Sequence, residues 1–143
     1  MDKAQKGFTL IELVVVITIL GILAAFAFPR FAALEVEARS ATVNGLAGSL
    51  RSASSLAHSL ALVTGSSAIG PVTMEGQTID LVEYYPNLAS IDNTLVDFTG
   101  FTFSPLSGIF TKDGAATPAN CSVDYDESPA SGVPTITVDT SAC

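Results

Sequence analysis

Basic residues are scarce in this chain. Its 143 residues include six lysines and arginines against fourteen aspartates and glutamates, which gives a formal net charge of -8. After Arg51, ten acidic residues are accompanied by one basic residue, Lys112. A protein that tracks phosphates needs clustered lysine and arginine side chains. The sequence therefore argues against specific nucleic-acid binding, and we interpret the acidity as a solubility feature of an exposed surface.

Residue types that serve in catalysis and metal binding are also rare. His58 is the single histidine, and one histidine supports neither a transition-metal site nor a Ser-His-Asp set. Several acidic residues late in the chain offer oxygen ligands that suit calcium, but they lack the ligand spacing of a calcium-binding loop. These residues are Asp113, Asp124, Asp126, Glu127 and Asp139. We therefore expect a protein that is not an enzyme and that holds no cofactor or metal ion.

Charge is almost absent from one long segment near the N-terminus. Residues 8–28 read FTLIELVVVITILGILAAFAF, and Glu12 is their only charged residue. At about 1.5 Å per residue, a helix of this length is roughly 31 Å long, enough to cross the hydrocarbon core of a bilayer once. Lys3 and Lys6 precede the segment. Because positively charged flanks stay in the cytoplasm, the rest of the chain is expected to face outward.

Three interpretations of this segment are open: a plain membrane anchor, a cleaved secretory signal, or a segment with a second task. Ala25-Phe26-Ala27 has the small-x-small form of a signal-peptidase site, although the apolar run is longer than an ordinary signal core. The third interpretation depends on the residues around the start of the run. A short basic stretch ends in Gly7, which Phe8 follows. Glu12 lies four residues beyond Phe8, and Pro29 closes the run.

Over residues 6–29 the chain resembles the N-terminal signature of type IV pilins, in a type IVa-like form, and of the related pseudopilins. The resemblance implies that residues 1–7 are a leader, that a prepilin peptidase cuts after Gly7, and that the same enzyme N-methylates Phe8. It also implies a homo-oligomeric helical filament. The subunit would wait in the bacterial inner membrane with its head outward. An assembly platform with an ATPase motor would then extract it into an extracellular pilus.

Glu12 is the residue of this segment that physical chemistry singles out. An acidic side chain within a membrane span costs a few kcal/mol and usually has a function. The resemblance implies that Glu12 helps subunits assemble by pairing with the N-terminal amine of a neighbouring subunit, which would offset that cost. The alternative is that Glu12 reaches the cytoplasmic interface, because it lies close to the start of the span.

Gly21 and Pro29 bracket a stretch with weaker helical preference. Pro29 has no N–H to donate to the carbonyl of Ala25, and its ring is expected to kink the helix. The resemblance implies that this stretch can lose helicity in an assembled filament. Whether it does so here is left open by the sequence.

Beyond Pro29 the pattern becomes periodic, which predicts an amphipathic helix over residues 29–64. Its apolar face is expected to comprise Val43, Leu46, Leu50, Ala53, Ala57 and Leu60. Gly65 supplies a C-terminal stop. Residues 65–143 alternate short strand candidates with turns, and they predict a β-rich head that packs on residues 29–64. Within it, Val72–Met74 and Thr78–Leu81 suggest a hairpin.

Later parts of the head are predicted in less detail. Tyr84-Tyr85-Pro86-Asn87 is expected to break the chain, and a short helical segment over residues 88–95, capped by Asn87, is expected next. Strand candidates follow around residues 101–103 and 109–111. The last two strands, around residues 121–125 and 136–138, are expected to form an antiparallel hairpin. The fold class is thus α+β: a long N-terminal helix, kinked at Pro29, packed against a small antiparallel sheet.

Cys121 and Cys143 are the only two cysteines. An even pair in an exported chain predicts a disulfide, and the type IV pilin resemblance places one in the same C-terminal region. A closed loop of about 23 residues would contribute roughly 3 kcal/mol in the chain-entropy model. The alternative is two free thiols.

The resemblance implies that the chain is a structural subunit, of the major kind, in a type IV pilus that serves adhesion or motility. The stretch from Gly76-Gln77-Thr78 to Tyr85-Pro86-Asn87 resembles, more loosely, the mannose-sensitive haemagglutinin branch of pilins. The alternatives are a pseudopilin of type II secretion and a minor pilin. The cysteine pair argues against the first, because major pseudopilins typically lack that disulfide and bind calcium.

Overall fold

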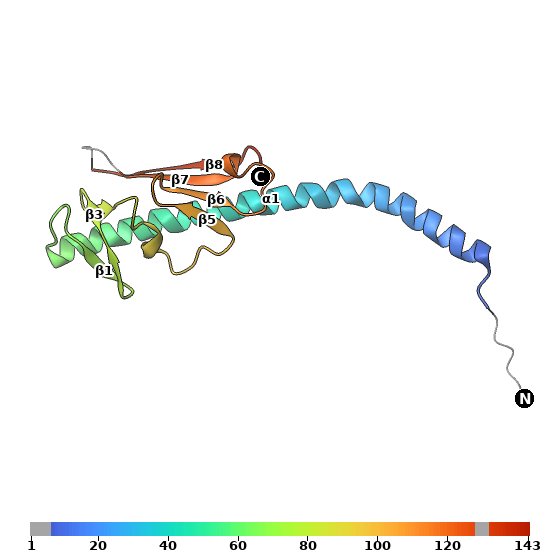
Figure 1. Ribbon diagram of the computed structural model, residues 1–143, viewed down its shortest axis with the longest axis horizontal. Coiled ribbons are helices and arrows are strands. Elements are labelled where there is room, and N and C mark those ends of the chain that lie inside the picture. The colour runs from blue at the N-terminus through green and yellow to red at the C-terminus, as the bar shows by residue number, and fades with distance from the viewer. Residues whose placement is uncertain (1–6, 128–131) are drawn as a thin grey trace, which may run out of the picture. The chain divides into compact units, whose positions relative to one another are not determined.

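The computed structural model describes residues 7–127 and 132–143, and it divides into two compact units (Figure 1). The first unit is Met1–Val36 and the second is Glu37–Cys143. Helix α1 (Leu10–Thr64) contributes to both units and continues without interruption through Pro29. It begins two residues after Phe8, close to the predicted start. The predicted kink at Pro29 stays a prediction.

The end of α1 follows from local chemistry. Gly65 has a φ of +68°, a backbone conformation that glycine adopts at little cost. The N–H of Ser66 donates to the carbonyl of Ala61 over 3.0 Å. A left-handed glycine followed by this hydrogen bond is a Schellman C-cap, which satisfies a carbonyl at the end of the helix. The predicted stop at Gly65 is therefore confirmed.

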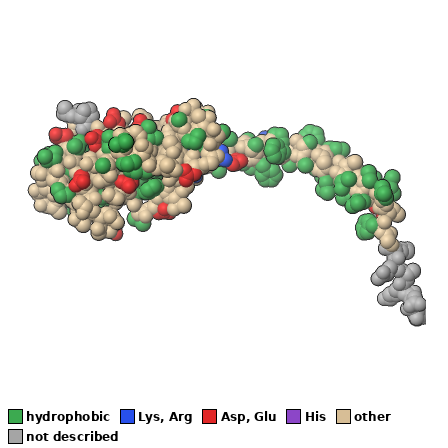
Figure 2. All heavy atoms as spheres, viewed as in Figure 1, with side chains coloured by type: hydrophobic (Ala, Val, Ile, Leu, Met, Phe, Trp, Pro, Cys, Tyr) green, Lys and Arg blue, Asp and Glu red, His purple; other side chains and the backbone are tan. Residues whose placement is uncertain are grey.

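The first unit presents its helix to solvent on every side. Each described residue from Gly7 to Val36 is exposed, and the 18-residue window that is most apolar has none of its residues buried. Figure 2 shows hydrophobic side chains along this part of the helix. By length and composition alone, α1 is able to cross a membrane.

In the second unit, one face of α1 is buried in the head. The buried positions are Val43, Leu46, Ala47, Leu50, Ser54, Ala57 and Ala61. Two predicted positions, Ala53 and Leu60, are only half-buried, and Ser54 and Ala61 take their places. The reason is helical geometry: the eighteen steps from Val43 to Ala61 make about five full turns, whereas Leu60 lies about 100° away. The prediction is therefore one residue off the buried face at two positions and correct at Ala57.

The described part of the head contains two small hairpins and one larger sheet. Strands β1 (Val72–Met74) and β2 (Gln77–Ile79) pair antiparallel, with Met74 opposite Gln77. Strands β3 (Leu81–Val82) and β4 (Tyr85–Pro86) form the second hairpin. The first hairpin confirms the prediction for this part of the chain.

The larger sheet has four antiparallel strands in the order β5-β6-β7-β8 (Figure 1). These are β5 (Phe101–Ser104), β6 (Ile109–Lys112), β7 (Ser122–Asp126) and β8 (Thr135–Asp139). In the last hairpin Val123 lies opposite Val138 and Tyr125 opposite Ile136, as the alternation of apolar residues predicts. A 3₁₀-helix, η2 (Pro118–Asn120), precedes β7.

Two predictions for residues 84–95 are wrong. Tyr85 and Pro86 do not break the chain but form β4, because Glu83 and Tyr84 both adopt positive φ values, 48° and 68°, and turn the chain back tightly. The expected helical segment over 88–95 is reduced to one 3₁₀ turn, η1 (Asp92–Thr94).

Asn87 begins a single helical turn but caps no α-helix. Its carbonyl accepts from the N–H groups of Ser90 and Ile91, and the bond to Ile91 has the spacing of one α-helical turn. Its side-chain oxygen accepts from the Ser90 hydroxyl over 2.8 Å, and within the described residues no backbone N–H is bonded to that oxygen.

The main core joins the buried face of α1 to the four-stranded sheet. Its largest members are Tyr125, Phe110, Leu50 and Ile91, all fully buried. The Tyr125 hydroxyl donates to the carbonyl of Pro86 over 2.6 Å, which ties β7 to β4. Burial raises the pKa of Tyr125 to about 12. A smaller cluster packs the two hairpins on Ala61 of α1.

Candidate processing and assembly site

The residues around the predicted cleavage point precede α1 and are exposed. Gly7 and Phe8 have no regular secondary structure, and the Phe8 side chain is 90% exposed. Residues 1–6 of the predicted leader, with Lys3 and Lys6, lie outside the described residues. The peptide bond after Gly7 thus lies two residues ahead of the helix, in an exposed segment without regular secondary structure.

Glu12 lies in the first turn of α1 and forms a capping box with Thr9. The Thr9 N–H donates to Glu12 Oε2 over 2.8 Å, and the Thr9 hydroxyl donates to the same oxygen over 2.7 Å. In return, the Glu12 N–H donates to Thr9 Oγ1 over 3.3 Å. This reciprocal pairing satisfies two of the N–H groups that a helix start leaves unpaired. A carboxylate at this end is further favoured by the helix dipole.

Thr9 was not predicted from the sequence as a partner of Glu12. The signal was available, since Thr9-Leu10-Ile11-Glu12 has the spacing of a capping box directly before an apolar run. Both hydrogen bonds from Thr9 reach Oε2, and within the described chain no hydrogen bond reaches Oε1. Glu12 therefore caps the start of its own helix with Oε2, while Oε1 accepts no hydrogen bond within the described chain.

The remaining part of the predicted span is a continuous apolar surface. Leu10, Ile11 and Phe26 are each at least 70% exposed. A methyl group added at Gly21 would meet no other atom within 4 Å, so the conformation of this chain alone does not require glycine there. An exposed apolar surface this long marks a site that contacts lipid or another protein.

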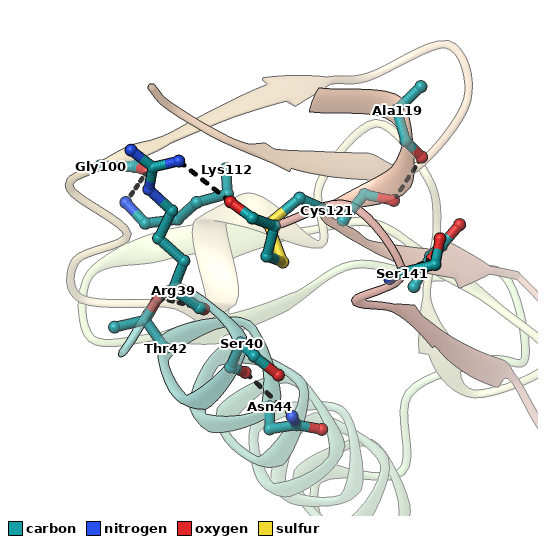
Figure 3. The surroundings of a disulfide bond; sticks show 12 residues. Arg39, Ser40, Thr42, Asn44, Gly100, Lys112, Ala119, Cys121 and Ser141 are labelled. Atoms are coloured by element: carbon teal, nitrogen blue, oxygen red, sulfur yellow. Dashed lines mark hydrogen bonds between the residues drawn. A yellow bond between two sulfur atoms is a disulfide. The ribbon is translucent and has the colours of Figure 1, made fainter. Parts of the chain in front are cut away.

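The C-terminal end of the head is closed by the predicted disulfide. Cys121 and Cys143 are bonded, with their Cα atoms 4.7 Å apart and a sequence separation of 22 residues (Figure 3). Both residues are buried. The guanidinium of Arg39 donates from Nη1 to the carbonyl of Cys143 over 2.9 Å. The disulfide prediction is confirmed, and the structure adds a tether to α1 that the sequence did not indicate.

The acidic residues of the head do not gather. Within residues 7–127 and 132–143, no group of three or more His, Cys, Asp or Glu side chains is arranged to hold a metal ion. The Thr99 hydroxyl lowers the pKa of Asp97, and the Ser141 hydroxyl lowers that of Asp139. Desolvation, together with the charge of Asp126, raises the pKa of Asp124.

His58 has a packing role. Its ring stacks on Tyr85 with centroids 4.2 Å apart, and Nδ1 lies 3.2 Å from the carbonyl of Tyr84. The contact connects α1 to the β3–β4 turn, so the residue is accounted for without a ligand.

These features define a class of proteins in which a long apolar helix, opened by Gly7, Phe8 and Glu12, is followed by a small β-rich head with a C-terminal disulfide. The family model described as "Prokaryotic N-terminal methylation motif" matches residues 2–28. The type IV major fimbrial protein FimA of Dichelobacter nodosus is 36% identical over 130 residues, which cover 88% of this chain and 68% of FimA. The chain belongs to the type IV pilin family.

Two further relatives match over shorter stretches. The type IV major alpha-pilin of Moraxella bovis is 34% identical over 105 residues, 73% of this chain and 52% of the relative. The type IV narrow pilus major component PilA5 of Thermus thermophilus is 54% identical over 52 residues, 36% of this chain and 45% of the relative. The matched regions thus span about half of these two relatives. No solved structure matches the chain at a significant level.

Proposed function

We propose that this chain is a structural subunit of a bacterial type IV pilus, of the major kind, and that the pilus serves adhesion or motility. The observation that supports this most directly is the exposed apolar helix start in which Gly7, Phe8 and Glu12 stand in the order of the methylation motif. The relatives named above are themselves major pilins. That favours a pilus subunit over a type II secretion pseudopilin or a minor pilin.

Processing would begin at the leader, residues 1–7. A prepilin peptidase would cut the bond between Gly7 and Phe8 and then methylate the new α-amino group. Both residues precede the helix and are exposed, which suits an enzyme that must hold them in extended form. The cut also removes Lys3 and Lys6, which oppose extraction of the segment from the membrane.

Residues 8–28 would have two roles, one in the membrane and one in the filament. Before assembly they would span the inner membrane with the head outward, since their length matches the hydrocarbon core. After assembly the same apolar surface would pack against equivalent helices in the filament. Lipid and a helix bundle are about equally apolar, so this transfer has little hydrophobic driving force. An assembly platform with an ATPase motor would have to supply the work.

Glu12 would specify how a subunit enters the filament. Its Oε2 is engaged by Thr9 and its Oε1 is available for a further donor. The cationic N-terminal amine at Phe8 of a neighbouring subunit is such a donor, and charge-assisted hydrogen bonds of this kind are strong in an apolar environment. We further propose that the stretch from Gly21 to Pro29 is where helicity would be lost in the filament.

The rest of the chain would form the head of the subunit and the helix that supports it. The second half of the helix, residues 29–64, would pack on the head, and residues 65–143 would form the outer surface of the filament. A filament needs a heterologous contact that repeats along an axis without closing.

The test is a pair of substitutions in cells that assemble the pilus. With Glu12→Ala, cleavage after Gly7 should proceed, but the subunit should not enter filaments. With Glu37→Ala, which removes an exposed acid outside the span, filaments should form at the normal level. Normal filaments from the Glu12→Ala variant would refute the assembly role.

A further inference from the structure

The second unit contains a small cavity that the proposed pilus function leaves without a role. Its volume is about 310 Å³ and it lies between α1, β4 and the start of β8. Its lining residues are Arg51, Ser54, Ser55, Tyr85, Val133, Pro134 and Ile136. This volume is at the lower end for pockets that bind small molecules. It suits a ligand of monosaccharide or amino-acid size.

The charge of this cavity is unlike that of the rest of the head. The head is strongly acidic, yet the described lining of the cavity contains one cation, Arg51, and no acidic side chain. Arg51 donates from Nη2 to the carbonyl of Ile136 over 3.2 Å, which holds the guanidinium at the cavity. Within the described residues it makes no ion pair. A guanidinium has five N–H donors, so most of them are left for a ligand.

A second polar group in the cavity also lacks a partner. Ser54 is only 3% exposed, and no described atom lies at hydrogen-bond geometry from its Oγ. The nearby Tyr125 hydroxyl donates to the carbonyl of Pro86 and is not within hydrogen-bond geometry of Ser54 Oγ. The Ser54 hydroxyl is therefore unsatisfied within the described residues. Leaving such a buried group unpaired is costly, and a ligand acceptor would remove that cost.

The other residues that line the cavity determine which non-acidic groups a ligand can place there. The Tyr85 ring is fixed by its stacking on His58, and Val133, Pro134 and Ile136 add apolar surface. These apolar walls suit the carbon skeleton of a ligand whose acidic group binds Arg51. We propose that this cavity binds a small organic carboxylate. The Arg51 guanidinium would donate hydrogen bonds to the carboxylate oxygens, and the Ser54 hydroxyl would be an additional donor.

Such a carboxylate has two possible sources. One is a free acid, such as a uronic acid sugar. The other is an acidic side chain on a second copy of this strongly acidic chain. Arg51 itself is exposed, so we expect weak binding by a free acid, in the millimolar range. A neighbouring copy in a filament would gain from its high effective concentration.

The test uses the full-length protein labelled with ¹⁵N in detergent micelles. Glucuronate is titrated at constant ionic strength, and the Nε–Hε signals of the arginines are followed. The proposal predicts a saturable shift of the Arg51 signal and no shift at Arg30, which is exposed and outside the cavity. Glucose, which lacks the carboxylate, should produce no shift. If Arg51 does not respond, or responds equally to glucose, the proposal is overturned.

Variants separate a specific site from general charge attraction. Arg30→Gln should leave glucuronate binding unchanged, whereas Arg51→Lys and Ser54→Ala should each weaken it at least fivefold while the amide spectrum of the head is retained. Equal weakening by Arg30→Gln would overturn the proposal. The Arg51 signal is finally recorded in assembled filaments without added ligand. A position matching the glucuronate-bound state identifies a neighbouring copy as the source, and the unliganded position identifies a free acid.

Discussion

Arg39 and Cys143 are 104 residues apart in sequence, yet the guanidinium of Arg39 donates to the carbonyl of Cys143 over 2.9 Å. The same cysteine is bonded to Cys121, whose carbonyl accepts the Lys112 N–H over 2.8 Å. The end of the described chain is therefore fixed twice, once covalently to the start of β7 and once by a charged donor on α1. Figure 3 shows both connections.

Replacing Arg39 by Ala should destabilise the head by about 1–2 kcal/mol, because a hydrogen bond with a charged donor is lost at a half-buried position. Urea unfolding of the full-length protein in detergent, followed by tyrosine fluorescence, measures this. The matched control is Arg30→Ala, which removes an exposed arginine from the first unit. Equal unfolding midpoints for the two variants would show that the tether contributes nothing.

Removing the disulfide should cost more. A loop closed over 22 residues corresponds to roughly 3 kcal/mol in the chain-entropy model. The double variant Cys121→Ala/Cys143→Ala should lower the free energy of unfolding by about that amount, and reduction of the unaltered protein should match it. A wild-type unfolding midpoint in the double variant would contradict a stabilising role.

Gly108 should tolerate substitution poorly. Its φ is +72°, and an added methyl group would overlap the carbonyl oxygen of Tyr125. Gly114 is the matched control, since its φ is +74° but nothing lies within 4 Å of the added group. Gly114→Ala should cost about 1 kcal/mol for the backbone alone. Gly108→Ala should cost at least about 2 kcal/mol more, because backbone must move; similar unfolding curves would refute the close approach of the turn to β7.

Thr9 should matter for the first turn of α1. Thr9→Ala removes one half of the capping box and should destabilise the helix start by about 1 kcal/mol. Amide hydrogen exchange at Glu12 would then be roughly fivefold faster. Thr18→Ala is the control, because Thr18 Oγ1 donates to the Val15 carbonyl within the helix and caps nothing. The same exchange rate in both variants would argue against the box.

Asp124 should give the head a pH dependence of definite sign. Desolvation raises its pKa in the folded protein, so the folded state binds this proton more tightly than the unfolded state does. Its ionisation therefore opposes folding as the pH rises. Asp124→Asn should stabilise the head at pH 7 and have little effect at pH 3, where the acid is protonated in both states. Thermal unfolding at the two pH values checks this, and a loss of stability at pH 7 would contradict it.

Much of the architecture could be predicted because it depends on local patterns. The apolar run from Phe8, the stop at Gly65 and the alternation through Val123 and Tyr125 each reflect one period or one residue type. The last hairpin and the disulfide followed from these patterns and from the cysteine count.

The failures have separate physical causes. Glu83 and Tyr84 adopt positive φ values that their residue types do not suggest, so β4 was missed. Ser54 replaces Ala53 on the buried face because the position of a face depends on accumulated helical rotation. The reach of Arg39 to Cys143 depends on tertiary folding, which a local pattern does not contain.

The central claim is that this chain is cut after Gly7, methylated at Phe8 and polymerised. Filaments sheared from cells that express it, resolved by electron microscopy and analysed by intact-mass spectrometry without reduction, test all three at once. The account predicts filaments whose subunit begins at N-methylated Phe8 and contains one disulfide. A subunit that begins at Phe28, as an ordinary secretory signal ending at Ala27 would produce, would contradict it.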